Sequence, residues 1–251
     1  MSTAVPPARP SLGRALLRLF TVQGSWNYER MQGIGMGVSE QPLIRDLAGN
    51  GTAYRAAVAR AAQFFNAHPY LCGLAVGATA RAEHDGVPPE QVVRLRTALC
   101  GPLGALGDRL VWAGWLPLTS GLALIGVALG LGVRAVLGFL IVYNIGHVAL
   151  RWWALRAGWT YGGRVATALR EPVLQRATAL SAPAMALVTG AALPLVAQSL
   201  ASGFVGWTRA ALAVVAAGGF ALLWWRRARL TGLRFGLVLL ALATLGGWLW
   251  H

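Results

Sequence analysis

The sequence predicts an all-α, polytopic membrane protein, and three observations of composition and pattern support this fold class. Hydrophobic residues make up 56% of the 251 residues, charged residues only 12%, and the mean hydropathy is +0.56. Long apolar runs fill the second half of the chain, as expected of helices that cross a bilayer. The 22 basic residues are all arginines and lie between these runs, where arginines set membrane topology and contact lipid headgroups.

The same composition argues against other classes of protein. A nucleic-acid-binding protein gathers its basic residues into one stripe with stacking aromatics, so we expect no nucleic-acid partner. Cys72 and Cys100 lie in apolar surroundings and form neither a disulfide framework nor a metal cluster, so we expect no metal and no cofactor. The opening residues MSTAVPPARPSLGR contain no apolar run, which predicts a short cytoplasmic tail without a cleaved signal peptide.

The first third of the chain predicts amphipathic helices beside the membrane. Residues 13–60 are rich in arginine, and Tyr54–Phe65 repeats arginine and apolar residues at helical spacing, which suits a helix at the interface. Leu71–Ala80 is apolar but only about ten residues long, too short for a hydrocarbon core of about 30 Å. It is a re-entrant or interfacial segment, or part of a helix buried by protein. Arg81–Arg96 predicts a polar loop followed by a new helix start.

About five transmembrane helices follow, preceded by a short glycine-rich run, Ala98–Gly107, which predicts a re-entrant segment. The predicted spans are Leu110–Val133 with a kink at Pro117, Ala135–Leu150, Leu180–Leu200, Phe204–Trp225 and Phe235–Trp250. Three regions result. Residues 1–97 hold the amphipathic helices and a re-entrant or interfacial segment, residues 98–178 form a central membrane region with the re-entrant GPLGALGD motif and a basic cytoplasmic loop, and residues 179–251 form the C-terminal transmembrane helices.

The arginines also predict the orientation of the chain. They crowd the loop from Arg151 to Arg176 and the loop from Arg226 to Arg234. Two hairpins separate these loops and the basic N-terminal third, so all three can lie in the cytoplasm. We therefore expect a cytoplasmic N-terminus, and an odd final span leaves His251 outside.

Three motifs give the chain a resemblance to a known family. They are GSWNYERMQGIGMG (Gly24–Gly37), QFFNAHPY (Gln63–Tyr70) and CGPLGALGDRLVW (Cys100–Trp112). Their order and spacing resemble those of the IID membrane subunit of mannose/fructose/sorbose-type bacterial sugar phosphotransferase systems, over about Leu17–Gly162. The resemblance implies an IIC-type membrane partner in the bacterial inner membrane. It also implies soluble IIA and IIB subunits that pass phosphate from phosphoenolpyruvate to a hexose-type sugar, and hence no catalytic residue in this chain.

The sequence also departs from the family pattern. Ala67 stands in place of a threonine, Arg109 in place of a small or uncharged residue, and Leu116 in place of an arginine. Of a Met-Glu-Glu stretch only Glu83 remains, followed by His84, and the C-terminal third is shortened. A second function therefore stays open: a transport-inactive regulatory or scaffolding membrane protein that retains the IID fold. An unrelated membrane enzyme ranks last, because the sequence contains no catalytic constellation.

Five polar residues within the motifs are candidates for sugar binding or for the translocation path: Asn27, Glu29, Asn66, His68 and Asp108. The amide and carboxylate at positions 27 and 29 suit sugar hydroxyls. A helix cap or an interhelical network is the slightly favoured alternative, because buried polar groups usually bind one another.

The second and third motifs leave similar alternatives. Pro69 keeps His68 out of the helical region, so freed backbone groups beside Asn66 favour a small polar pocket. The resemblance implies that His68 carries no phosphoryl group. Asp108 is either a functional acid within the membrane or an interfacial acid neutralised by Arg109. GPLGALGD lacks the Lys-Ser/Thr ending of a nucleotide-binding loop.

Overall fold

The computed structural model describes residues 10–47 and 51–201 and the single positions 206, 214 and 218. Two compact units divide the chain, Met1–Val196 and Ala197–His251, and nearly all the described residues belong to the first. The helices are α1 (Leu12–Leu19), α2 (Gly33–Ile44), α3 (Thr52–Ala61), α4 (Cys72–His84), α5 (Pro89–Gly107), the π-helix η1 (Asp108–Trp115), α6 (Leu116–Ala128), α7 (Val133–Tyr161), the 3-10 helix η2 (Gly162–Arg170) and α8 (Pro172–Ala201). This architecture confirms the predicted all-α class.

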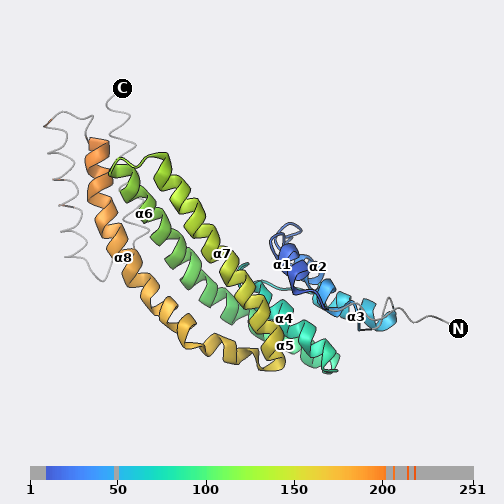
Figure 1. Ribbon diagram of the computed structural model, residues 1–251. Coiled ribbons are helices and arrows are strands. Elements are labelled where there is room, and N and C mark those ends of the chain that lie inside the picture. The colour runs from blue at the N-terminus through green and yellow to red at the C-terminus, as the bar shows by residue number, and fades with distance from the viewer. Residues whose placement is uncertain (1–9, 48–50, 202–205, 207–213, 215–217, 219–251) are drawn as a thin grey trace. The chain divides into compact units, whose positions relative to one another are not determined.

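Three helical stretches are long and apolar enough to cross a membrane: Pro89–Ala128, Val133–Arg170 and Pro172–Val196. They contain or overlap the first three predicted spans. Their helices α6, α7 and α8 run side by side (Figure 1). Of the other two predicted spans, Phe235–Trp250 lies outside the described residues, and Phe204–Trp225 does so except for three single positions.

The segment Ala98–Gly107 differs from the predicted re-entrant segment. It is the second half of α5, which continues through η1 into α6 as one helical stretch. Pro102 is accommodated inside α5, where no break occurs. The irregularity comes instead just before Pro117. There η1 has the wider turns of a π-helix and directly precedes α6, which carries Pro117 in its first turn.

Helix α4 is the buried centre of the fold. Every residue of Leu71–Ala80 is buried, so this run belongs to a helix enclosed by protein, the third of its predicted alternatives. Helix α4 packs against α7 through glycines. A Cβ atom at Gly77 would lie 2.4 Å from the backbone nitrogen of Trp159, and one at Gly158 would lie 2.3 Å from the backbone carbonyl oxygen of Leu74. The two backbones therefore touch directly, an approach that only small residues permit.

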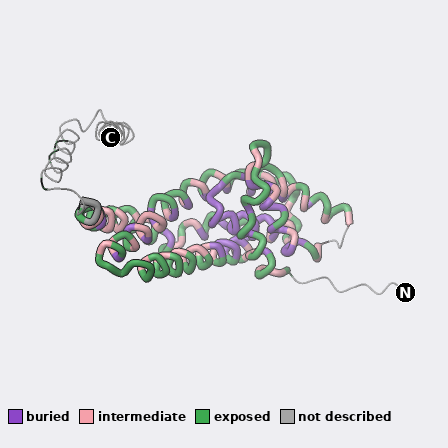
Figure 2. Tube along the Cα trace, turned by 90° about the horizontal axis from the view of Figure 1, so that it is seen from above, coloured by how far each residue is buried: buried purple, intermediate pink, exposed green. Residues whose placement is uncertain are grey.

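The buried residues gather around α4, where α1 and α2 also pack (Figure 2). The first half of α7 is different, because large apolar side chains such as Leu137, Ile141 and Ile145 are exposed along it. An apolar helix surface of this kind suits a lipid or protein environment within a membrane. The fold thus joins a buried N-terminal core to apolar helices that extend from it.

Candidate functional site

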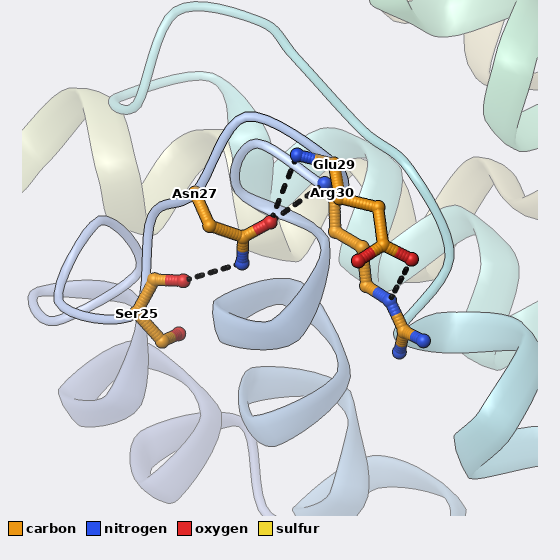
Figure 3. Close-up of polar contacts among 4 residues, drawn as sticks. All are labelled: Ser25, Asn27, Glu29 and Arg30. Atoms are coloured by element: carbon orange, nitrogen blue, oxygen red, sulfur yellow. Dashed lines mark hydrogen bonds and ion pairs between the residues drawn. The ribbon is translucent and has the colours of Figure 1, made fainter.

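The first motif forms a tight turn around Asn27 (Figure 3). The Asn27 Oδ1 atom accepts hydrogen bonds from the backbone N–H groups of Glu29 at 3.1 Å and Arg30 at 2.8 Å, and its Nδ2 donates to the Ser25 carbonyl at 3.2 Å. Glu29 lies 3.8 Å from Arg30 Nε, and its side chain is 83% exposed. Asn27 therefore shapes its own turn, as asparagine commonly does, and it does not cap α2, whose N-cap residue is Gln32.

This turn connects the first motif to the second. Met31 adopts a left-handed φ of 51° and forms a β-bridge with Phe65. Gln32 N–H donates to the Phe65 carbonyl at 2.9 Å, and Phe65 N–H donates to the Arg30 carbonyl at 3.2 Å. The loop before α2 and the loop before α4 are thereby paired through their backbones.

The side chain of Gln32 strengthens this pairing. Its Nε2 donates to the Ala67 carbonyl at 2.8 Å, while its Oε1 accepts from Ala67 N–H at 3.3 Å and from the Cys72 thiol at 3.1 Å. Burial raises the pKa of Cys72 to about 12, so the thiol keeps the proton that it donates. Sequence analysis missed Gln32, although it is a lone polar residue in a glycine-rich apolar run.

His68 joins the second motif to the third. Gly107 lies against it so closely that a Cβ atom at position 107 would be 2.1 Å from His68 Cβ. His68 Nδ1 accepts a hydrogen bond from Tyr70 N–H at 3.2 Å, so the proton belongs on Nε2, a buried atom with no partner among the described residues. Burial, as the main cause, and the positive charge of Arg151 together lower the pKa of His68 to about 4. The imidazole is therefore neutral at physiological pH.

An aromatic cluster surrounds His68. The Tyr70 ring stacks on His147 with centroids 4.0 Å apart and planes 12° apart. Trp112 of η1 lies 4.9 Å from the His68 ring. The hydroxyls of Tyr70 and Tyr143 are 2.7 Å apart and share a hydrogen bond. The cluster thus brings η1 and α7 together with the loop that carries the second motif.

Arg151 places a buried positive charge in this cluster. Its Nε donates to His147 Nε2 at 2.7 Å, and its Nη1 donates to the Leu19 carbonyl at the end of α1. Its guanidinium carbon lies 4.8 Å from the Tyr70 ring centroid and 5.2 Å from that of Phe20. Cation–π contacts and hydrogen bonds therefore stabilise the charge, and no carboxylate of the described residues pairs with it.

A cavity of about 190 Å³ opens beside the cluster, between η1 and α7. Aromatic rings of Tyr70, Trp115 and His147 line it, with apolar side chains from Leu110, Val111 and Leu150 and the small Gly146. The Trp115 indole rests on Gly146, where a Cβ atom would lie 2.7 Å from the ring, and its Nε1 donates to the Tyr143 carbonyl at 3.4 Å. Aromatic faces with few polar groups suit a small neutral ligand that has an apolar face.

The five predicted site residues do not share one pocket. His68 is buried in the cluster, whereas the side chains of Glu29, Asn66 and Asp108 are exposed and Asn27 holds its turn. None of the five lines the cavity, although the structure describes all of them.

Sequence analysis missed Tyr70, Trp115, His147 and Arg151. Their sequence neighbours are apolar, so these residues resemble parts of a hydrophobic core or membrane anchors. Within the described ranges, no group of three His, Cys, Asp or Glu could hold a metal.

A second buried polar cluster lies at the opposite end of α4. The Glu40 carboxylate accepts from the Thr79 hydroxyl at 2.8 Å, and Arg60 pairs with Glu83 through two bonds of 2.9 and 2.7 Å. Arg96 lies over the Phe65 ring and donates to the Gln63 carbonyl at 3.0 Å. Burial raises the pKa of Glu40 to about 7. This cluster has no space for a ligand and ties α2, α3, α4 and α5 together.

Comparisons with known proteins agree with the three motifs. The family model "PTS system mannose/fructose/sorbose family IID component" matches residues 9–199. The sorbose-specific EIID component of Klebsiella pneumoniae is 30% identical over 167 residues, covering 64% of this chain and 61% of that protein. The mannose-specific EIID component of Escherichia coli K12 is 30% identical over 168 residues, covering 64% and 59%. The chain thus spans about three fifths of the length of these curated relatives.

Solved structures show the same fold. A structure described only as a membrane protein aligns with a TM-score of 0.70 at 23% identity, covering 94% of both chains. A chain of the mannose transporter ManYZ in complex with microcin E492 aligns with a TM-score of 0.57 at 23% identity, covering 94% of this chain and 93% of that one. The protein is therefore a membrane protein, and the chain belongs to the IID component family of the mannose/fructose/sorbose phosphotransferase systems.

Proposed function

We propose that this chain takes part in phosphoenolpyruvate-dependent uptake of a hexose-type sugar across the bacterial inner membrane, together with an IIC-type membrane subunit. Membership of the IID family supports this proposal, as do the mannose- and sorbose-specific names of its relatives. The ManYZ complex supports a second membrane subunit. Soluble IIA and IIB subunits would supply the phosphoryl group, and this chain would shape the path.

The observation that carries the proposal is the meeting of all three motifs at His68, beside an aromatic cavity. Gln32 of the first motif holds Ala67 of the second, and Gly107 of the third receives His68. The cavity next to them has stacking faces of the kind that hold the apolar face of a sugar ring. His68 itself is buried and neutral, which suits a positioning role better than a phosphoryl carrier.

A pair of tryptophan variants tests the cavity. Trp115→Leu removes a stacking face of the cavity, while Trp26→Leu removes a half-exposed tryptophan in the first loop. In membrane vesicles that contain this chain and its IIC subunit, we expect Trp115→Leu to raise the sugar concentration needed for half-maximal uptake. Trp26→Leu should leave it unchanged. Equal behaviour of both variants, with normal assembly, would remove the cavity from the path.

The exposed candidates Asp108 and Asn66 require a separate test, because neither lines the cavity. If they contact sugar or the path, Asp108→Asn and Asn66→Ala impair uptake while assembly stays normal. Asp108→Asn preserves size and removes charge, so it separates an electrostatic role from packing. Unchanged uptake in both variants would make these residues architectural and place the sugar contacts mainly in the partner subunit.

For the orientation, we propose a cytoplasmic N-terminus and an external C-terminus. The support is the cluster of arginines in the last part of α7, in η2 and at the start of α8, which includes the exposed Arg156, Arg164 and Arg176. A reporter enzyme that is active only outside the cytoplasm, fused after His251, should be active. Activity of a cytoplasm-specific reporter at the same site would indicate an even number of crossings.

A further inference from the structure

A shallow groove of about 580 Å³ runs along the outer face of α7 beside α1. Two rows of α7 side chains line it, each with a spacing of about four residues, and Leu16 of α1 forms its wall. One row contains Ile141, Ile145 and the small Ala149, and the other contains Asn144, Val148 and Trp152. Rows of this spacing, with a groove between them, are the surface onto which a second helix packs.

Asn144 distinguishes this groove from an ordinary lipid-facing surface. It is exposed, and its Nδ2 donates to the Leu140 carbonyl at 2.7 Å within its own helix. The Oδ1 atom remains an acceptor, and no donor of the described residues reaches it. An open amide acceptor is costly in hydrocarbon, where water cannot satisfy it.

The position of Asn144 along α7 strengthens this point. The segment between Arg134 and Arg151 contains no charged residue, and at about 1.5 Å per residue it covers about 25 Å. Asn144 lies about 15 Å from Arg134, near the middle of a hydrocarbon core of about 30 Å. The polar side chain is thus exposed at the depth where exposure to lipid is least favourable.

We propose that this groove binds a transmembrane helix of the IIC-type subunit, which presents a hydrogen-bond donor to Asn144 Oδ1. This inference rests on the proposed function, since it assigns a docking surface for that same partner. Ala149 leaves room for close approach, as small residues do at helix interfaces in membranes. The partner helix should carry serine, threonine or asparagine at mid-membrane, with small residues one turn away.

Two substitutions at one position test the inference. Asn144→Leu removes the acceptor, and leucine suits a lipid-facing surface better than asparagine does. Asn144→Gln keeps the amide. Each variant is co-expressed with an epitope-tagged IIC-type subunit from the same genome, and the two are purified together from detergent. We expect Asn144→Leu to weaken association roughly threefold to thirtyfold, the range for one interhelical hydrogen bond, and Asn144→Gln to retain most of it.

A photo-crosslinking amino acid provides the second measurement. Placed at Ile145, it should form an adduct with the tagged IIC subunit, whereas at Leu124, an exposed position on α6, it should not. The inference would be overturned if Asn144→Leu associated normally with the IIC subunit. It would also be overturned if the adducts at Ile145 formed only with lipid, with this chain's own C-terminal segment or with a second copy of this chain. Sugar uptake that persists in that case would leave the proposed function intact. Failure of the wild-type chain to bind the IIC subunit would overturn both.

Discussion

Gly107 and His68 touch so closely that position 107 has no room for a side chain, because a Cβ atom there would lie 2.1 Å from the Cβ of His68. This contact fixes η1 and the third motif against the loop of the second motif. It also sets the position of the imidazole that Trp112 and Tyr70 surround.

Gly107→Ala should therefore destabilise the protein by roughly 1–3 kcal/mol, the usual cost of overpacking. Gly101→Ala is the matched control, since it lies in the same helix with no atom within 4 Å of its added methyl group. That control should be neutral or more stable by up to about 1 kcal/mol, because alanine favours helix. The unfolding midpoint in detergent measures both. Equal midpoints for the two variants would show that His68 and Gly107 do not touch.

The crossing of α4 and α7 gives a second prediction. Gly158→Ala places a methyl group 2.3 Å from the Leu74 carbonyl oxygen, which is backbone and can move only if the helices separate. We expect a low yield of folded protein and a lower unfolding midpoint. Gly138→Ala, in the same helix with no atom within 4 Å, should retain the wild-type yield. A wild-type yield and midpoint for Gly158→Ala would argue against the crossing.

Gln32 is predicted to hold the loop of the second motif in place. Gln32→Leu leaves the buried N–H and C=O of Ala67 without their partner, at a cost of roughly 1–3 kcal/mol for each group. We expect faster hydrogen–deuterium exchange in peptides that cover residues 65–72 and a lower unfolding midpoint. Gln41→Leu, which removes only an exposed bond to Arg18, is the control. Unchanged exchange in Gln32→Leu would contradict the pairing.

Glu40 predicts a dependence of stability on pH. Burial raises the pKa of this carboxyl from 4.5 to about 7, although Arg96 and the Thr79 hydroxyl oppose the rise. The folded state therefore binds the proton more tightly than the unfolded state. Its contribution to stability is fully present below about pH 4.5, is lost as pH rises toward 7, and is constant above that.

Glu40→Gln keeps an oxygen for the Thr79 hydroxyl but removes the titration. Its unfolding midpoint should be similar to that of the wild type near pH 4.5 and higher above pH 7. The difference in midpoint between the two proteins, measured across this range, isolates Glu40 from other titrating groups. Glu83→Gln, which breaks the bidentate pair with Arg60, should instead be less stable than the wild type at neutral pH. A difference that stays constant with pH would rule out a raised pKa at Glu40.

The sequence predicted the helical class and the first three long apolar helices, because length and hydropathy decide both. It failed at Ala98–Gly107, where glycine and proline suggested a break, although α5 runs through Pro102. The glycine at position 107 is needed for close packing against His68 and does not break the helix. The sequence alone cannot show this tertiary contact.

The candidate site was predicted only in part. His68 was found because Pro69 marks an irregular loop beside polar residues. Tyr70, His147 and Arg151 were missed because they come from separate elements that meet only through tertiary packing. Asn27 and Glu29 were singled out for their chemistry, yet Asn27 uses its hydrogen bonds on its own turn. Residue type alone cannot distinguish a local turn from a ligand contact.

Reconstituted uptake is the measurement that tests the central claim most directly. Vesicles would contain the IIC-type subunit with or without this chain, and the soluble phosphocarrier subunits and phosphoenolpyruvate would be supplied. We predict that radiolabelled hexose accumulates as its phosphate only when this chain is present, and that omission of phosphoenolpyruvate abolishes accumulation. Equal accumulation of sugar phosphate with and without this chain would contradict its role in translocation.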